Sequence, residues 1–563
     1  MKNFLLLIAL FGNTVLYSQT KNITVDFNTP AGTGKQMTGV NTGPNSIVSG
    51  TTEQCLNSIG NHLIRTHDYH GPCDYWGYTN FFNYFNQTFN YSFQPHLTSG
   101  YNWTTTDAQI AEITDAGFQP FFRVGISFPG AGPSPASPMP KDADGINFKT
   151  FAGIAKRTAM HYTAGWNNGF NYTIPYWEIW NEPNNNASWI VDSAQAYYRL
   201  YQQCADSLKS FNPQLKVGGP AAAKNAFYAG GIHYTINQNY VSNFLNFCQT
   251  NSVPLDFYSF HMYDKKNPYH IKILVDTLSY YLNQYGFSNT ELVVSETNIN
   301  TGGYDNTAKG CSYLTSSLIS VVNTRLSNFI WYRGVDLNPL CNSDIGNTPS
   351  FTLNGYAYKF FNEVNDSTPV FIQSAGNEFN ADNVNDSLNN VMILSGKNNA
   401  NTQVKVLISN HESIYSDISL TLQNLPWSAS DNISVVTETI NSSGYQTSTT
   451  SVNGAATLTY NIPAVGDASV FLITFEYNPV TALHSLAATT NTLVYPNPAG
   501  NNVAVNTNLK KYTLRLTDTF GRVFFEQQNK QEIDLTNIPD GLYFIQIQDE
   551  TRAVENIKLV VAK

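Results

Sequence analysis

The chain has 563 residues, of which 12% are charged and 13% are aromatic, and its formal net charge is −10. This length exceeds what one hydrophobic core organises, so we expect several domains. The negative charge argues against a nucleic-acid partner, which requires clustered lysine and arginine.

The N-terminus has the pattern of an export signal. A lysine at position 2 precedes the apolar run 4–11, and small and polar residues follow, so we place a signal peptide at residues 1–19. The run is too short to span a bilayer, and no later segment has 18 uninterrupted apolar residues, so we expect no transmembrane segment. We therefore expect export through the periplasm and a secreted or cell-surface location.

Residues 20–365 alternate short apolar strands with helical patterns, which indicates βαβ units and a parallel sheet. Eight strands are predicted, the number that a closed (β/α)₈ barrel of the α/β class needs. They lie at 36–41, 62–67, 119–125, 176–181, 216–219, 257–261, 292–295 and 328–332. Helical spacing of apolar residues predicts helices at 194–211, 241–248 and 271–285. An aromatic-rich insertion at 69–101 is expected to shape a cleft.

The pattern changes to alternating strands in residues 366–478, which predicts an antiparallel β-sandwich. The predicted strands are 391–395, 404–409, 417–422, 433–439, 455–462 and 468–476. Residues 479–492 have little periodicity and are interpreted as a linker. Residues 493–563 are predicted to form a small all-β domain with a hairpin at 518–522.

Six cysteines permit 15 disulfide pairings, and none has the spacing of a metal site such as CxxC. Cys204 and Cys248 fall on apolar helix faces, where a free buried thiol and a bridge are equally expected. Cys311 and Cys341 flank the later barrel loops and are the better disulfide candidates. We predict no structural metal and no cofactor.

Two glutamates each end a predicted barrel strand. Glu182 follows the strand 176–181 in the motif Asn-Glu-Pro, and Glu296 follows four mostly apolar residues in the strand 292–295. The carboxyl ends of the strands form the mouth of a (β/α)₈ barrel, where such enzymes do their chemistry. Hydrolysis of a glycosidic bond requires two carboxyl groups, and this barrel mouth is expected to hold both.

The neighbours of the two glutamates suggest different roles. Glu182 lies beside Trp177, Trp180 and Pro183, apolar residues that favour its neutral form, so we assign it as general acid and then general base. Glu296 lies between two hydroxyl residues that can stabilise an anion, so we assign it as nucleophile. Glu178 lies four residues deeper than Glu182 and is interpreted as a structural ion-pair partner of an arginine at 65 or 123.

The motifs Trp-Glu-Ile-Trp-Asn-Glu-Pro-Asn at 177–184 and Ser-Glu-Thr at 295–297 resemble clan A glycoside hydrolases. Family 39, which holds β-xylosidases and α-L-iduronidases, is the closest likeness. Leu-Ile-Arg-Thr-His at 63–67, Leu-Lys-Val-Gly-Gly-Pro-Ala at 215–221 and Phe-Tyr-Ser-Phe-His-Met-Tyr at 257–263 extend the likeness over about residues 35–365.

The resemblance implies roles for five further residues. Asn181 would bind the 2-hydroxyl of the sugar, Tyr263 or His261 would orient Glu296, and His67 would reach the glycone. Trp331 would form the floor of the −1 subsite. The family usually has a polar, loop-forming stretch after this strand, whereas this chain continues with Arg-Gly-Val-Asp at 333–336.

The last domain resembles the type A C-terminal sorting domain of the type IX secretion system. The likeness rests on Val-Tyr-Pro-Asn-Pro at 494–498, a Gly-Arg turn at 521–522 and Pro-Asp-Gly-Leu-Tyr at 539–543. It implies an export address read by the type IX machinery and absent from the mature enzyme. A small carbohydrate-binding sandwich is the alternative.

The sequence therefore predicts a secreted, retaining, β-xylosidase-like glycoside hydrolase acting on an oligosaccharide or polysaccharide. An endo-acting clan A glycanase is one alternative and would have an open groove in place of a pocket. A non-catalytic glycan-binding surface protein is the other, and the presence of both glutamates argues against it. An adhesin acting through the sandwich would bind through residues 369–477 alone.

Overall fold

The structure is a computed structural model, and it describes most of the chain after residue 18. The described residues are 19–42, 52–67, 73–83, 88–126, 146–184, 189, 194–223, 227–230, 233–236, 238–263, 267–299, 303–335, 338–342, 350–375, 391–463, 465–466, 468–477, 492–507, 509–518, 521–549 and 554–563. The predicted signal peptide, except for its last residue, and most of the predicted linker lie outside these residues.

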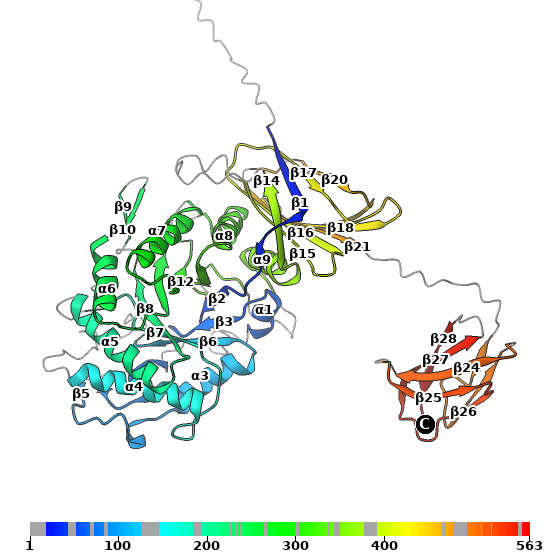
Figure 1. Cartoon of the computed structure of the whole chain (residues 1–563), viewed down its shortest axis with the longest axis horizontal. Helices are drawn as coiled ribbons and strands as arrows, with labels where there is room; N and C mark the ends of the chain where they lie inside the picture. The colour runs from blue at the N-terminus through cyan, green and yellow to red at the C-terminus, as the bar shows by residue number, and fades with distance from the viewer. Residues whose placement is uncertain are drawn as a thin grey trace, which may run out of the picture. The chain divides into compact units, whose positions relative to one another are not determined.

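Eight parallel strands close into a barrel (Figure 1). Their order around the barrel is β2 (Thr38–Asn41), β3 (Leu63–Arg65), β6 (Gln119–Val124), β7 (Tyr176–Ile179), β8 (Lys216–Ala222), β11 (Phe257–Met262), β12 (Glu291–Thr297) and β13 (Leu326–Trp331). β13 pairs in parallel with β2, so the first and last strands are neighbours. All eight predicted strands are confirmed, with boundaries that differ by a few residues.

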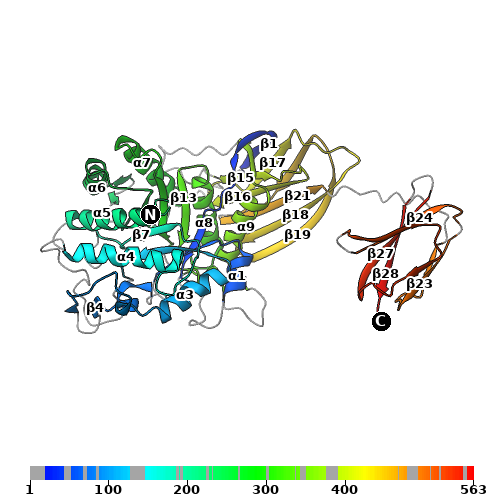
Figure 2. The ribbon, with the colours of Figure 1, turned by 60° about the horizontal axis from the view of Figure 1, so that its bottom comes forward.

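Eight helices follow the eight strands in turn (Figure 2). They are α1 (Glu53–Ser58), α3 (Thr104–Asp115), α4 (Ile146–Ala164), α5 (Ala194–Phe211), α6 (Gln238–Thr250), α7 (His270–Gln284), α8 (Ala308–Val321) and α9 (Leu353–Ser367). Inside the barrel, alternate strand residues form a buried apolar cluster of Leu63, Phe121, Tyr176, Phe257, Val293 and Ile330. This layer is a packed core and leaves only the mouth for chemistry.

The aromatic insertion after β3 is mostly internal packing. It contains α2 (Tyr75–Tyr78), β4 (Phe82–Asn83), β5 (Thr88–Phe89) and the 3₁₀ helix η2 (Thr98–Gly100). Tyr75, Tyr78, Phe81 and Phe82 are all buried. A second short hairpin, β9 (Phe227–Gly230) and β10 (His233–Ile236), follows β8.

The second part of this unit is one nine-stranded sheet. Its order is β19 (Gly444–Asn453), β18 (Asn432–Asn441), β21 (Ala468–Tyr477), β16 (Gln403–His411), β15 (Val391–Lys397), β14 (Val370–Ala375), β1 (Thr20–Thr33), β17 (Asp417–Gln423) and β20 (Thr457–Ile462). Leu420 of β17 and Val435 of β18 share one buried cluster although their strands are far apart in this order. The sheet therefore curls over its own core and closes like a sandwich.

Three strands of this sheet differ from the sequence prediction, and one of them, β14, was not among the predicted strands. The predicted range 20–365 assigns β1 to the barrel, but β1 pairs with β14 and β17 of the nine-stranded sheet. β19 was not predicted because its residues are almost all polar and exposed, which removes the apolar alternation that marks a strand.

Helix α8 joins the barrel to the nine-stranded sheet. Each of its residues except Lys309 is buried, because the barrel lies on one side and the sheet on the other. Polar pairs cross this interface: Ser316 Oγ donates to Ser409 Oγ at 2.9 Å, and Ser312 Oγ lies 2.8 Å from His411 Nδ1. The sheet thus helps to hold α8 and, through it, the preceding barrel strand β12.

Residues 479–563 form a separate compact unit. One sheet has the order β22 (Leu493–Tyr495), β23 (Asn502–Asn506) and β26 (Glu532–Asp534); the other has β25 (Val523–Gln528), β24 (Tyr512–Asp518), β27 (Gly541–Asp549) and β28 (Val554–Val561). The predicted hairpin joins β24 to β25, and Gly521 adopts φ +81° in its turn.

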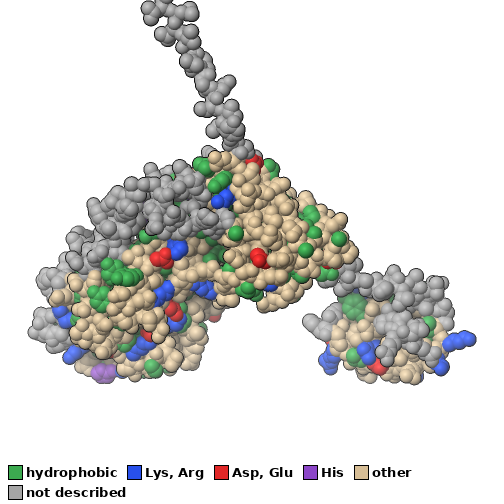
Figure 3. Space-filling view, turned by 45° about the horizontal axis from the view of Figure 1, so that its top comes forward, with side chains coloured by type: hydrophobic (Ala, Val, Ile, Leu, Met, Phe, Trp, Pro, Cys, Tyr) green, Lys and Arg blue, Asp and Glu red, His purple; other side chains and the backbone are tan. Residues whose placement is uncertain are grey.

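Charged side chains are sparse on one face of the protein. On the face shown in Figure 3, charged side chains are scattered singly and do not gather into a patch of one sign. Within the described part of the chain, no helix is both long and apolar enough to cross a membrane.

One disulfide joins Cys55 to Cys341. The prediction named Cys341 correctly but was wrong about Cys311, which is a free buried thiol, as are Cys73, Cys204 and Cys248. The physical reason is barrel closure: Cys55 follows β2 and Cys341 follows β13, and these two strands are paired.

We expect a Cys55→Ser, Cys341→Ser variant to unfold more easily, because the bridge closes a loop of 286 residues in the unfolded chain. The expected loss in the free energy of unfolding is about 2–5 kcal/mol, measured by urea titration. Dithiothreitol should lower the midpoint of the wild type toward that of the variant and leave the variant unchanged. An identical midpoint for the wild type with and without reductant would contradict the prediction.

Candidate active site

Glu182 reaches the barrel mouth through a sharp turn after β7. Trp180 and Glu182 adopt φ +72° and +49°, left-handed values that cost about 1–3 kcal/mol each in residues other than glycine. Neighbouring strands hold the turn: the Trp180 N–H donates to the Val124 carbonyl at 2.8 Å, and the Glu182 N–H donates to the Ala221 carbonyl at 3.1 Å. The strain is consistent with a functional turn.

A side chain also fixes the chain beyond Glu182. The Asn184 amide donates to the Ala223 carbonyl at 3.1 Å and accepts from the Ala223 N–H at 2.8 Å. These two hydrogen bonds, made to the residue after β8, resemble the bonds between paired strands. The Glu182 carboxyl is therefore presented from a backbone held on both sides.

Glu296 faces the barrel interior because of an irregularity in β12. Val293 points into the barrel, so strict alternation would direct Glu296 toward the helices. The pairing of β11 with β12 shifts between Phe260 and His261, so that His261 lies opposite Glu296 and Ser295 is the extra residue. Such a bulge re-aims the side chains that follow it and is frequent next to active sites.

Arg65 on β3 is the centre of a buried polar cluster. Its guanidinium donates to Glu296 Oε1 at 2.8 Å, Asn41 Oδ1 at 2.9 Å and Asn181 Oδ1 at 2.8 Å. It also forms an ion pair of 2.6 Å with Glu178, and neither side chain of that pair is exposed. The predicted structural role of Glu178 is confirmed.

Three more side chains surround the Glu296 carboxylate. Tyr263 Oη donates to Oε2 at 2.7 Å, His67 Nε2 lies 3.1 Å from Oε1, and His261 Nδ1 lies 3.4 Å from Oε2. Burial alone would raise the pKa of Glu296. The attraction of His261, His67 and Arg65 outweighs burial and holds the pKa of Glu296 well below its usual value. Glu296 is therefore ionised.

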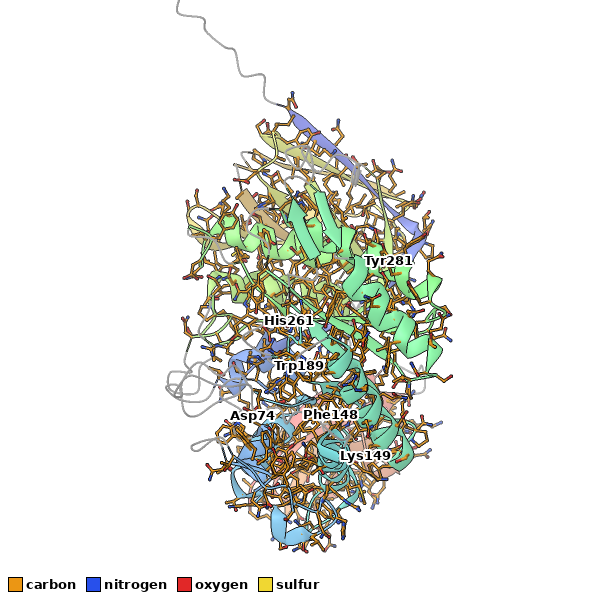
Figure 4. The ribbon with its side chains drawn as sticks, turned by 90° about the vertical axis from the view of Figure 1, so that its left-hand side faces the viewer. Asp74, Phe148, Lys149, Trp189, His261 and Tyr281 are labelled. Carbon is orange, nitrogen blue, oxygen red and sulfur yellow. A yellow bond between two sulfur atoms is a disulfide. The ribbon has the colours of Figure 1, made fainter. Side chains whose placement is uncertain are left out.

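His261 bridges the two predicted catalytic glutamates. Its Nδ1 lies 2.8 Å from Glu182 Oε1, and the ligand-type atoms of His261, Glu182 and Glu296 all lie within 4.8 Å of one another. Figure 4 labels His261 among the side chains of the barrel. The Glu182 carboxyl is 18% exposed and that of Glu296 only 6%, so the outer group meets solvent and the inner one does not.

The same three residues form the group, among those described, that could hold a metal ion. Their surroundings fit a metal poorly. Arg65 and His67 already supply positive charge to Glu296, and a bound cation would lie beside the arginine.

Trp331 follows Ile330, which faces the barrel interior, so strand alternation turns the Trp331 side chain away from that interior. It is 1% exposed, donates its indole N–H to the Asn338 carbonyl at 3.0 Å, and belongs to the apolar cluster outside the barrel core. The next residue, Tyr332, has its ring 5.4 Å from that of His67 and 6.0 Å from that of Tyr263, both edge to face. Tyr332 was missed by the sequence reasoning, and the alternation of side chains along β13 was the available signal.

Comparison with known proteins finds a family that part of the barrel resembles. Residues 86–283 match the model described as glycosyl hydrolases family 39, and residues 493–562 match a secretion system C-terminal sorting domain. This part of the barrel is therefore similar to family 39 glycosyl hydrolases. The match to the first family covers the Asn-Glu-Pro turn of Glu182 and the strand of His261, but ends before Glu296.

Curated relatives of this chain are similar to it over a short segment. A β-xylosidase from Geobacillus stearothermophilus is 39% identical over 92 residues, which are 16% of each chain. One from Caldicellulosiruptor saccharolyticus is 33% identical over 88 residues, 16% of this chain and 15% of that relative. The matched segment thus spans under a fifth of each relative.

Solved structures share the fold over most of the chain. A glucosidase from Croceicoccus marinus aligns with a TM-score of 0.64 at 18% identity, covering 82% of this chain and 99% of that structure. A GH39 enzyme from Xanthomonas axonopodis pv. citri aligns with a TM-score of 0.59 at 16% identity, covering 83% and 100%. At these identities the likeness is one of fold.

The lowered pKa of Glu296 predicts a pH-dependent contribution to stability. The contribution is fully present above pH 4.5, the ordinary value for a glutamate, and is lost as the pH falls through the lower pKa of the folded state. Below pH 4.5 this one carboxyl group can lower the free energy of unfolding by up to about 1.4 kcal/mol for each pH unit. Glu296→Gln should therefore show a shallower decline in the free energy of unfolding between pH 4.5 and 3 than the wild type.

Glu476→Gln, in β21 of the nine-stranded sheet, is the matched control because it removes a carboxylate far from the cluster. Urea titrations at each pH provide the measurement. Equal slopes for Glu296→Gln and the wild type would show that Glu296 is not held ionised.

Proposed function

We propose that this protein is a secreted retaining glycoside hydrolase that works by double displacement, with Glu182 as acid and base and Glu296 as nucleophile. The observation that carries the proposal is the separation of the two carboxyl groups, with atoms that lie within 4.8 Å of one another. Carboxyl groups about 5–5.5 Å apart suit direct attack on the sugar, whereas wider pairs leave room for a water and invert the product.

The environments of the two groups support these roles. Glu296 is ionised and buried, so its carboxylate can attack the anomeric carbon and form a glycosyl–enzyme bond. Glu182 lies on the solvent side, where it can donate a proton to the departing oxygen. It then takes a proton from the water that breaks the covalent bond.

His261 is proposed to position both glutamates. Its Nδ1 contacts Glu182 at 2.8 Å and lies 3.4 Å from Glu296. When Nδ1 carries a proton, the ring can donate to either carboxylate. It can thus hold Glu182 while that group is charged, in the second half of the reaction.

The sugar is proposed to be held by groups around this pair. Arg65 donates to Asn181 Oδ1, which leaves the Asn181 amide nitrogen as the donor for a 2-hydroxyl. His67 is proposed to reach the glycone as well as Glu296. Tyr332 fits the −1 floor better than Trp331, because its ring packs against His67 and Tyr263.

A β-xyloside is the proposed substrate, because the curated relatives of the family 39 segment are β-xylosidases. An endo-acting enzyme and a non-catalytic glycan binder are the alternatives. A panel of aryl-glycosides and polysaccharides separates them: an exo-enzyme releases single sugars, an endo-enzyme releases oligosaccharides, and a binder releases none. Proton NMR of the first product should show retained anomeric configuration, and inversion would exclude Glu296 as nucleophile.

The domain organisation is proposed to serve export. Residues 1–19 are the signal peptide, 20–365 and 366–478 hold the barrel and the sheet, 479–492 are the linker, and 493–563 are the sorting domain. The match of residues 493–562 to a secretion sorting domain supports recognition by the type IX machinery after passage through the periplasm. The mature protein is then secreted or kept on the cell surface.

The two glutamates should respond differently to substitution. Glu182→Gln should lose about 10²–10⁴-fold in kcat/KM on xylobiose, but much less on 2,4-dinitrophenyl β-xyloside, whose leaving group needs no proton. Glu296→Gln should lose activity on both substrates, because no nucleophile remains. Steady-state kinetics measure both, and unchanged turnover in the two variants would eliminate the hydrolase proposal.

Removal of residues 479–563 should separate export from catalysis, because these residues form a compact unit of their own. The purified truncated chain is expected to keep the full-length kcat/KM on aryl β-xyloside. In the native host it should accumulate inside the cell envelope and be missing from the medium and the cell surface. Immunoblotting of cell fractions measures where the truncated chain is found. Normal export of this chain would refute the sorting role.

A further inference from the structure

A groove lies on the outer wall of the barrel between α5 and α6, two helices that run side by side in Figures 1 and 2. It encloses about 630 Å³, within the size range of small-ligand sites. The residues used below are Gln195 and Tyr198 on the α5 side, and Asn243, Asn246, Phe247 and Asn251 on the α6 side. None of them contacts the cluster around Glu296.

The rim of the groove is rich in carboxamides. Gln195, Asn243, Asn246 and Asn251 are all exposed, and among the described lining residues Arg199 alone is charged. Exposed helix positions more often carry glutamate, lysine or arginine, which favour the helix more than asparagine does. Helix stability therefore does not explain these asparagines.

The asparagines follow the helical repeat. Asn243, Asn246 and Phe247 are spaced i, i+3 and i+4 on α6, which places them on one face. Gln195 and Tyr198 are spaced i and i+3 on α5 and face them across the groove. Two amides of α6 and one amide of α5 thus face the same space.

Aromatic rings form the apolar part of the groove. The rings of Tyr198 and Phe247 lie 5.6 Å apart and are tilted by 41°. Tyr198 is buried at 3% exposure, whereas Phe247 is partly exposed and offers ring surface to the groove. In such a groove the aromatic surface can pack against the apolar part of a ligand, and the amides around it can fix the ligand's orientation by hydrogen bonds.

We propose that this groove is a second carbohydrate site, which binds a neutral stretch of polysaccharide away from the two glutamates. A carboxamide both donates and accepts hydrogen bonds, as a sugar hydroxyl does, and an aromatic ring packs against the C–H face of a pyranose. The nearly uncharged lining does not suit a phosphate or a nucleic acid. The proposal rests on the proposed function only in the choice of polysaccharide, since binding needs no hydrolysis.

The test is native affinity electrophoresis of the full chain in gels that contain soluble xylan. The parent carries Glu182→Gln and Glu296→Gln so that the polymer is not consumed. Asn243→Glu with Asn246→Glu on this parent replaces two amides by charges that a helix tolerates, and should raise the Kd for xylan by about 10-fold or more.

Gln249→Glu is the matched control. Gln249 is exposed on the same helix, but its amide lies toward Gly286, beyond α7. This control should leave the Kd for xylan unchanged. The parent, the groove variant and the control have the same cleft around residues 182 and 296, so binding there contributes equally to all three. An unchanged Kd in the groove variant, an equal loss in the control, or no retardation of the parent would each overturn the proposal.

A second readout separates this proposal from the hydrolase proposal. In the chain with both glutamates intact, the groove substitutions should leave kcat/KM on aryl β-xyloside unchanged and lower the rate on soluble xylan. Retardation of the inactive parent and its variants tests xylan binding in the groove even if the protein hydrolyses no substrate. Equal loss on the aryl substrate would indicate a general structural defect and contradict the assignment.

Discussion

The buried guanidinium of Arg65 is the interaction on which the site depends. It lies between two glutamates, Glu178 and Glu296, and also holds the amides of Asn41 and Asn181. A lone buried charge is very costly, so each of these groups is stable only because the others are present. The cluster joins β2, β3, β7 and β12 and fixes the Glu296 carboxylate against the other three strands.

The charge balance of this cluster explains how the two glutamates proposed as catalytic can differ in ionisation. Arg65 and the two histidines keep Glu296 ionised despite its burial. Glu182 contacts His261, and its side chain lies nearer to solvent than that of Glu296. Two carboxyl groups in such different surroundings can take opposite roles at one pH.

The rest of the molecule keeps these strands in place. The nine-stranded sheet covers α8, the helix that follows the strand of Glu296, and buries polar pairs such as Ser316 with Ser409. The Cys55–Cys341 bridge ties the segments after β2 and β13, where the barrel closes. The sheet is therefore better understood as support for the barrel than as an independent binding module.

Local pattern in the sequence was enough for the barrel. Apolar strands and helical periodicity depend on near neighbours, so the eight strands and helices such as 194–211 were predictable. The positions of Glu182 and Glu296 at strand ends, and the pairing of Glu178 with an arginine, were predictable in the same way. β19 was not, because an exposed polar strand carries no apolar alternation.

Only the tertiary structure decided which side chains meet. The bulge at Ser295 turns Glu296 inward against simple alternation, and the pairing of β13 with β2 brings Cys55 to Cys341 in place of Cys311. Tyr332 borders His67 for the same kind of reason. Strand register and barrel closure are set by contacts between residues distant in the chain, and no local pattern in the sequence records them.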